Sequence, residues 1–131
     1  MEFLKHVPTT IPASFSDAIG ITTSQGIWIF VSGQLGVPLP PEQGSVSFEQ
    51  EVRAIFERIR AALGKLDAGM EHVVSIKAYL TDLAPYDVYS RVRAEMFPNN
   101  PPTSTAVQVA GLLRGAKIEV DAIAFLPRAA G

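Results

Sequence analysis

Two short segments hold the residues of this 131-residue chain that could carry chemistry. In the first, Lys117, Glu119 and Asp121 alternate with apolar residues, so they share one side of an extended strand. A carboxylate that is partly enclosed there can have a raised pKa and act as a general base or acid near neutral pH. The alternation alone favours a simpler interpretation, in which these side chains form the solvated side of the strand.

The second segment, Ser32-Gly33-Gln34, closes an apolar stretch. A glycine at a strand end leaves room for backbone N–H groups to approach a ligand, and we expect Gly33 to make such a contact. The alternative is that Gly33 marks a bulge or a bend in a sheet.

Metal and cofactor chemistry find no support in the sequence. His6 and His72 are too few and too far apart for a metal site, and no His-Glu-x-x-His segment occurs. The chain has no cysteine, which excludes disulfides and thiolate chemistry. The segment from Gly33 to Gly36 lacks the glycine pattern of a dinucleotide site, and there is no Walker sequence. We therefore expect neither a metal nor an organic cofactor.

The charge and hydropathy patterns argue against large anionic partners. The net charge is -2 and the pI is near 5.6, so neither nucleic acid nor a membrane surface is an expected partner. Arg53, Arg58 and Arg60 alternate with Glu51 and Glu57, which is typical of a solvated helix face, and ribonuclease activity gains no support. The longest apolar run, 27–31, is too short to span a bilayer, and the first residues show no export signal, so we expect a cytoplasmic protein.

The positions of turn and capping residues divide the chain into alternating strands and helices within one domain, residues 1–131. After an irregular start, strands are expected at 16–22 and 27–33 as a hairpin, at 73–80, and at 103–110 and 116–125 as an antiparallel hairpin. Helices are expected from Ser47, which has a capping-box spacing to Gln50, and over 85–97. The order ββαβαββ predicts an α/β (α+β) two-layer sandwich, with two helices on one face of a mixed sheet.

The burial pattern within these elements also follows from periodicity. The first helix has an apolar stripe from Phe48 to Leu66 and is expected to stop at Gly64 or Gly69. In the strand 73–80, Val74, Ile76, Ala78 and Leu80 are expected on one face.

One face of the predicted sheet has no helix to cover it. The run 27–31 is nevertheless apolar on both of its sides. Exposed apolar area costs about 25 cal/mol per Å², so we expect copies of the chain to bury it in a closed homo-oligomer. The alternative is that loops cover this face in a monomer.

Four segments resemble, in order and spacing, the signatures of the RidA/YjgF family. They are SFSDAI at 14–19, WIFVSGQLG at 28–36, VVSIKAYLTDL at 73–83 and PPTSTAVQVAGLLRGAKIEVDAIA at 101–124. The resemblance implies a chorismate-mutase-like fold, a homotrimer with small-molecule clefts between subunits, and no cofactor. Members of this family hydrolyse reactive enamines and imines derived from amino acids, releasing ammonia and a 2-keto acid.

The resemblance also implies roles for single residues. Glu119 matches the acid that positions or activates water in the family. With this match, a catalytic role for Glu119 is preferred over the interpretation that it only lies on the solvated side of a strand. Ser104 stands where the deaminases have an arginine that grips the substrate carboxylate, and Phe15 stands where a tyrosine is usual. A serine hydroxyl cannot replace a guanidinium, so Arg93 and Arg114 are candidates for that role. The expected substrate-binding residues are Phe15, Ser32, Gly33, Gln34, Ser104 and Arg114.

Three functions remain open on this basis. The leading hypothesis is an imine or enamine hydrolase (deaminase) of altered specificity, with Glu119 as its catalytic residue. The second is a non-catalytic trimer that binds a metabolite or a partner and has lost hydrolysis together with the arginine. The third and weakest is a structural or chaperone-like trimer that works through an apolar rim.

Overall fold

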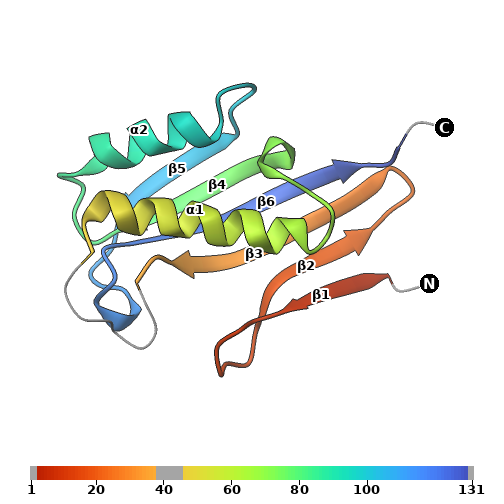
Figure 1. Cartoon of the computed structure of the whole chain (residues 1–131), viewed down its shortest axis with the longest axis horizontal. Coiled ribbons are helices and arrows are strands. Elements are labelled where there is room, and N and C mark those ends of the chain that lie inside the picture. Colours follow the sequence, from red (N-terminus) through yellow and green to blue (C-terminus); the bar gives the residue numbers. More distant parts are fainter. Residues whose placement is uncertain (1–2, 38–45, 130–131) are drawn as a thin grey trace.

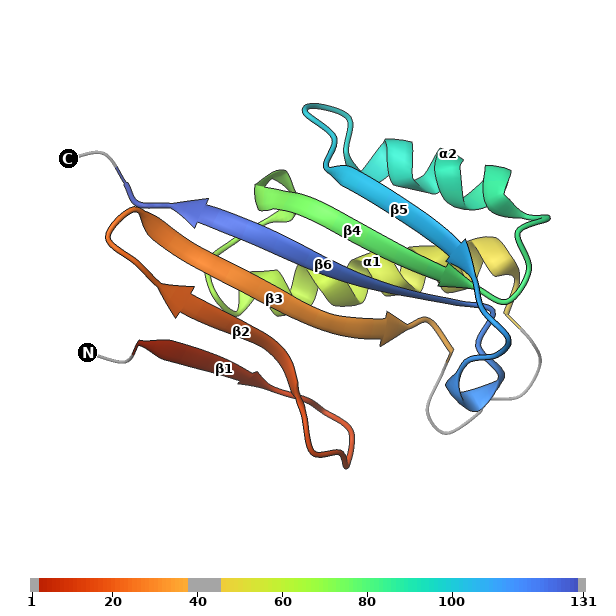
Figure 2. The ribbon, with the colours of Figure 1, turned by 180° about the vertical axis from the view of Figure 1, so that it is seen from behind.

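The computed structural model describes residues 3–37 and 46–129, which form two helices and a six-stranded mixed sheet (Figure 1). The strands are β1 (Leu4–Pro8), β2 (Ser16–Thr22), β3 (Gly26–Leu35), β4 (Val73–Leu80), β5 (Thr103–Gln108) and β6 (Ile118–Pro127). The helices are α1 (Phe48–Gly64) and α2 (Tyr86–Met96). Both helices lie on one face, and Figure 2 shows the other face of the sheet bare. The predicted two-layer α/β sandwich is confirmed.

The N-terminal segment forms a strand where an irregular start was expected. β1 pairs antiparallel with β2 at the edge of the sheet. Only Val7 of β1 is buried, so the sequence has no hydrophobic alternation that would predict the strand. Pro8 comes at its end, beside a register shift, where a missing N–H is tolerated.

The sheet order is β1-β2-β3-β6-β4-β5, so the predicted hairpin of the last two strands is wrong. β5 pairs parallel with β4 through the crossover helix α2, and β6 lies antiparallel between β3 and β4. Alternate residues of β6 are buried from Ile118 to Ala124, whereas β5 is mostly exposed. The strand with more apolar surface to bury therefore takes the centre, and β5 takes the edge.

Helix α1 begins as predicted. Ser47 Oγ accepts from the Gln50 N–H, and Gln50 Oε1 accepts from the Ser47 N–H, at 3.1 and 2.9 Å. Neither Gly64 nor Gly69 supplies the positive φ at the other end. Asp67 does, at φ 62°, and the Ala68 N–H then bonds to the Leu63 carbonyl at 3.0 Å, which is the Schellman pattern.

Two residues depart from the predicted burial pattern. Val74 is exposed and Val73 is buried in its place, because the pairing with β6 shifts between Val73 and Ser75. Glu51 was expected on the solvated face of α1, but it is only 2% exposed. Its Oε1 accepts from the Lys117 N–H at 2.7 Å, so this carboxylate joins α1 to the start of β6.

The bare face of the sheet is apolar at one end and polar at the other. At the apolar end, Trp28 and Phe30 of β3 lie opposite Phe125 and Ile123 of β6. Trp28 is 41% exposed and Phe30 is 45% exposed. The rings of Trp28 and Phe125 pack with their centroids 4.8 Å apart. Further along β6 the same face carries acidic groups. Within the described residues, no helix has both the length and the apolar character that crossing a bilayer requires.

Candidate functional site

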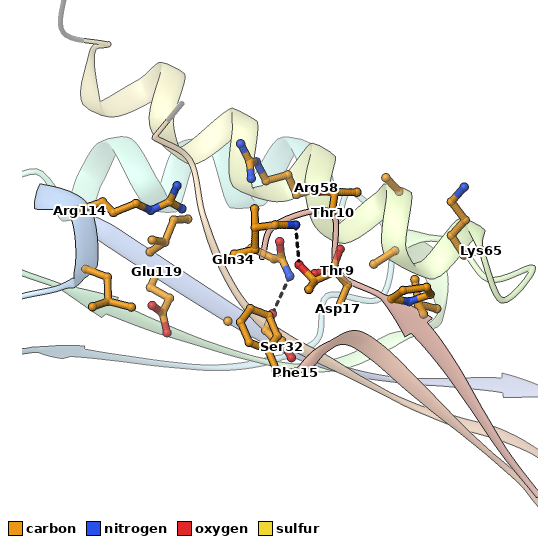
Figure 3. Close-up of a pocket in the computed structure, with 18 residues that line it drawn as sticks. Thr9, Thr10, Phe15, Asp17, Ser32, Gln34, Arg58, Lys65, Arg114 and Glu119 are labelled. Carbon is orange, nitrogen blue, oxygen red and sulfur yellow. Dashed lines mark hydrogen bonds between the residues drawn. The ribbon is translucent and has the colours of Figure 1, made fainter. Parts of the chain in front are cut away.

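A pocket of about 590 Å³ lies beside α1, at the end of β3 and the start of β6. Six of the expected site residues line it, namely Phe15, Ser32, Gly33, Gln34, Arg114 and Glu119. Figure 3 shows Gln34, Ser32, Phe15, Arg114 and Glu119 around its centre, with Arg58 on α1 and Lys65 at the C-terminal end of that helix. Ser104, the seventh expected residue, does not line this pocket.

A β-bulge brings Gly33 close to Glu119. Val31 pairs with Ala122 and Gln34 with Val120, so β3 has one more residue than β6 in this interval. The predicted alternative of a bulge at Gly33 is thus what the backbone adopts. A Cβ at Gly33 would lie 2.4 Å from Oε2 of Glu119, which means that glycine makes room for the carboxylate.

The environment of Glu119 favours its protonated form. Partial burial raises the pKa of the Glu119 carboxyl, and the negative charge of Asp121 on the same face raises it further. Asp121 itself accepts a hydrogen bond from the Tyr79 hydroxyl at 3.1 Å. A carboxyl whose pKa is shifted toward neutrality can both accept and return a proton. Glu119 is therefore the candidate acid–base group of the pocket.

Two polar side chains of the bulge are fixed by the backbone. Ser32 Oγ donates to the Ser16 carbonyl at 2.6 Å, and Gln34 Nε2 donates to the Ser32 carbonyl at 3.1 Å. These bonds hold the bulge against β2. They leave the hydroxyl oxygen of Ser32 and the side-chain carbonyl oxygen of Gln34 able to accept hydrogen bonds. The rim of the pocket is apolar, because Phe15 is 48% and Leu113 is 74% exposed.

Three cations surround the pocket. Arg114 has a left-handed backbone with φ 57°, a conformation that costs energy for a residue with a side chain. Arg58 lies on α1 and Lys65 is its C-cap residue. Sequence reasoning assigned Arg58 to a solvated face and passed over Lys65. Their spacing of seven residues, which places both on one helix face, is the signal that could have identified them. Among residues 3–37 and 46–129, no three acidic or histidine side chains are grouped to hold a metal ion.

Ser104 and Glu119 lie on opposite faces of the sheet. Ser104 pairs with Ile76, which in turn pairs with Ala122, and all three point toward the helices. Glu119 is three residues from Ala122 and points the other way. Two strand spacings of ~4.8 Å and three residues of ~3.3 Å separate Ser104 from Glu119 by about 14 Å. A cleft that includes both residues cannot form within one chain.

The fold and the pocket define a small two-layer α/β protein with two carboxyl side chains, Asp17 and Glu119, in a cavity of a size suited to a small molecule. The family model described as Endoribonuclease L-PSP matches residues 8–126. A RutC family protein of Pyrococcus abyssi is 32% identical over 126 residues, which are 94% of each chain. Reactive Intermediate Deaminase A of Arabidopsis thaliana is 35% identical over 101 residues, 75% of this chain and 53% of the plant protein.

The crystal structure of Escherichia coli TdcF with bound serine superposes with a TM-score of 0.77 at 23% identity and covers 96% of this chain and 99% of that one. The likeness to TdcF supports the fold. The family model spans residues 8–126, and the RutC family protein of P. abyssi aligns over nearly the full length of both chains. The chain therefore belongs to the RidA/YjgF family, whose relatives include reactive intermediate deaminases.

Proposed function

We propose that the protein is an imine or enamine hydrolase that acts on a small molecule in clefts between the subunits of a cytoplasmic homotrimer. The observation that carries this proposal is the Glu119 carboxyl, which lies in the pocket beside Gly33 with a raised pKa. The deaminase names of relatives support the reaction class. The serine bound to E. coli TdcF supports a ligand of amino-acid size.

The proposed reaction needs only water and one acid–base group. Glu119 takes a proton from a water molecule while the water oxygen bonds to the imine carbon. The π electrons of the C=N bond move to the nitrogen at the same time. Glu119 then gives that proton to the nitrogen of the carbinolamine. Glu119 next transfers the hydroxyl proton to the amino nitrogen, the C=O bond forms as the C–N bond breaks, and ammonia leaves. With 2-iminopropionate the products are pyruvate and ammonia.

The bare apolar surface supports assembly into a trimer. Trp28 and Phe30 on the uncovered face are large and exposed, as are Phe15 and Leu113 at the rim of the pocket. Covering such a patch by another copy removes apolar area from water at about 25 cal/mol per Å². A neighbouring copy that covers Phe15 and Leu113 would also close the pocket.

Substrate specificity is proposed to differ from that of deaminases with an arginine at position 104. Ser104 supplies no cation, and its hydroxyl already accepts from Arg93 at 3.0 Å. Within one chain its position on the helix side keeps it from Glu119. A substrate in the pocket instead meets Arg114, Arg58 and Lys65.

The alternative is a non-catalytic trimer that binds a metabolite or a partner. The observation that favours it is the serine at position 104, which would remove a carboxylate clamp and with it the hydrolysis of imino acids. The same pocket would then retain a ligand without turning it over.

A coupled assay with freshly generated 2-iminopropionate tests the proposal. Wild type should release pyruvate above the rate of spontaneous hydrolysis, and Glu119→Gln, an isosteric change, should remove that activity. The Ser104→Arg variant tests substrate specificity. Activity that appears only in this variant would support the alternative of a non-catalytic binding protein. A wild type equal to the Glu119→Gln variant rejects the hydrolase for this substrate. Sedimentation that finds a monomer at micromolar concentration rejects the trimer.

A further inference from the structure

The pocket of Glu119 reaches both sides of the sheet. The pairing of β3 with β2 extends only to Val31, so residues 32–35 at the end of β3 have no paired residue in β2 and border an open edge. All four of them line the pocket, which passes this edge from the bare face to the side of the helices. Glu119 faces the bare side, whereas Arg58 and Lys65 lie on the side of α1. We name the part of the pocket beside these two cations the helix-side end.

One face of α1 forms the wall of the helix-side end. Arg58, Ala61, Ala62 and Lys65 line the pocket and follow the i, i+3, i+4, i+7 spacing of a single helix face. The two alanines have short side chains and leave room between the cations, whose Cα atoms are about 10 Å apart along the helix axis. Figure 3 shows Lys65 at the end away from Glu119, with Arg58 between them. An elongated ligand that enters from Glu119 therefore meets two cations.

The charges of these two cations are not balanced by neighbouring side chains. In the part of the chain that the structure describes, no carboxylate forms an ion pair with Arg58 or Lys65. Arg53 and Arg60 on the same helix, by contrast, pair with glutamates of α1 or α2. The arginines of α1 outside the pocket are thus neutralised by neighbours, while the cations that line it remain available to a ligand.

The connection between β1 and β2 adds hydroxyl groups to the pocket. Thr9 and Thr10 both line it. Thr9 Oγ1 accepts from the Ile11 N–H at 3.3 Å, which leaves its hydroxyl proton free to donate. Asp17 of β2 also lines the pocket and brings one negative charge. Two cations and one carboxylate leave an excess of one positive charge, which suits one carboxylate of a ligand better than a phosphate dianion.

We propose that Arg58 and Lys65 bind a second carboxylate of the substrate, so that the enzyme acts on imines and enamines of dicarboxylic amino acids. This inference rests on the proposed hydrolysis at Glu119 and names its substrate class. The cavity of about 590 Å³ is in the range that holds drug-sized ligands, and it far exceeds the needs of a three-carbon imine. Figure 3 shows Arg114 at the same end as Glu119, where it is available to the carboxylate next to the reacting carbon.

2-Iminoglutarate has the features that this arrangement calls for. It carries one carboxylate beside the imine carbon and a second at the far end of its chain. The first can meet Arg114 and the second Arg58 and Lys65. With water it gives 2-oxoglutarate and ammonia, by the same steps as 2-iminopropionate.

Rates with two imino acids test the substrate class. 2-Iminoglutarate and 2-iminopropionate are generated in the assay from glutamate and alanine by amino-acid oxidases, and the released 2-oxo acid is measured. Wild type should have the higher kcat/KM for 2-iminoglutarate. The double variant Arg58→Gln/Lys65→Gln should lower the ratio of the two kcat/KM values at least tenfold, mainly through the KM for 2-iminoglutarate. Arg60→Gln, at an arginine of α1 that pairs with Glu57, is the matched control and should leave the ratio unchanged.

Binding of the products provides a readout that does not need catalysis. In calorimetric titration at constant ionic strength, wild type should bind 2-oxoglutarate more tightly than pyruvate, which lacks the second carboxylate. The double variant should raise the Kd for 2-oxoglutarate at least tenfold. If wild type hydrolyses neither imine but binding follows this pattern, the hydrolase is rejected and the carboxylate site is retained.

Three results would overturn the inference. If wild type hydrolyses 2-iminopropionate and the ratio of kcat/KM values is the same in the double variant, hydrolysis stands but Arg58 and Lys65 do not select the substrate. An equal Kd for 2-oxoglutarate in wild type and the double variant excludes the helix-side end as its binding site. If 2-oxoglutarate binds with unchanged Kd to protein saturated with pyruvate, its carboxylates lie outside the site of Glu119.

Discussion

Gly33→Ala is expected to disable the Glu119 carboxyl without unfolding the protein. The new Cβ would lie 2.4 Å from Oε2 and 2.8 Å from Cδ of Glu119. Since contacts between such atoms need roughly 3.4 Å or more, the carboxylate must move by about 1 Å. Gly33 has no positive φ, so alanine adopts its backbone. Alanine stabilises the folded state by about 0.4–1 kcal/mol because it restricts the unfolded chain more than glycine does. An off-rotamer Glu119 side chain costs about 0.5–1.5 kcal/mol. The free energy of unfolding should therefore change by no more than about 1 kcal/mol.

Two measurements separate this effect from a general loss of structure. A displacement of about 1 Å in a catalytic group can cost on the order of 100-fold in rate, and we expect kcat/KM for 2-iminopropionate to fall by that order. In an NMR titration the pKa of Glu119 should move down toward its ordinary value as the carboxylate turns to solvent. Gly111→Ala is the matched control, because its Cβ would meet no atom within 4 Å. Unchanged Glu119 titration, or a loss of several kcal/mol, would refute the reasoning.

Three further changes test the supports of the site. Glu51→Ala should lower the free energy of unfolding in urea by about 1.5–3 kcal/mol, because it leaves the Lys117 N–H without its charged acceptor, and Glu51→Gln should lose less than half of that. Ser47→Ala removes the cap of α1 and should cost about 1 kcal/mol by the same method, with an unchanged m-value. The pKa of Glu119 is raised on folding, so this group contributes stability that is present below its ordinary pKa of 4.5 and is lost as pH rises through its folded value. Glu119→Gln should therefore be more stable than wild type near neutral pH, and this difference should disappear on acidification below pH 4.5, as followed by thermal unfolding.

Local signals in the sequence predicted the elements well. The capping box at Ser47 and the hairpin of β2 and β3 depend on residues within a few positions of each other, and both form as expected. β1 lacked such a signal because it buries only Val7. The place of β6 between β3 and β4 is decided by which strand has more apolar surface to bury, a comparison between distant segments that spacing and turn residues do not encode.

The candidate site was predicted in part for the same reason. Family-like motifs pointed to Ser32, Gly33, Gln34 and Glu119, and the bulge in β3 brings these residues together. Arg58 and Lys65 were not recognised, since an arginine on a polar helix face looks the same whether it borders a pocket or only water. The separation of Ser104 from Glu119 follows from strand pairing, and no pattern along the chain reveals it.

The position of β6 has a consequence for how the protein is made. β3 and β4 are joined in the sheet only through β6, which comes last in the sequence. During synthesis the first three strands and the β4-α2-β5 unit leave the ribosome before the strand that unites them, and each then presents an unpaired edge. The sheet can close only after β6 has been synthesised. Shortening that segment should leave two half-sheets that are prone to aggregate.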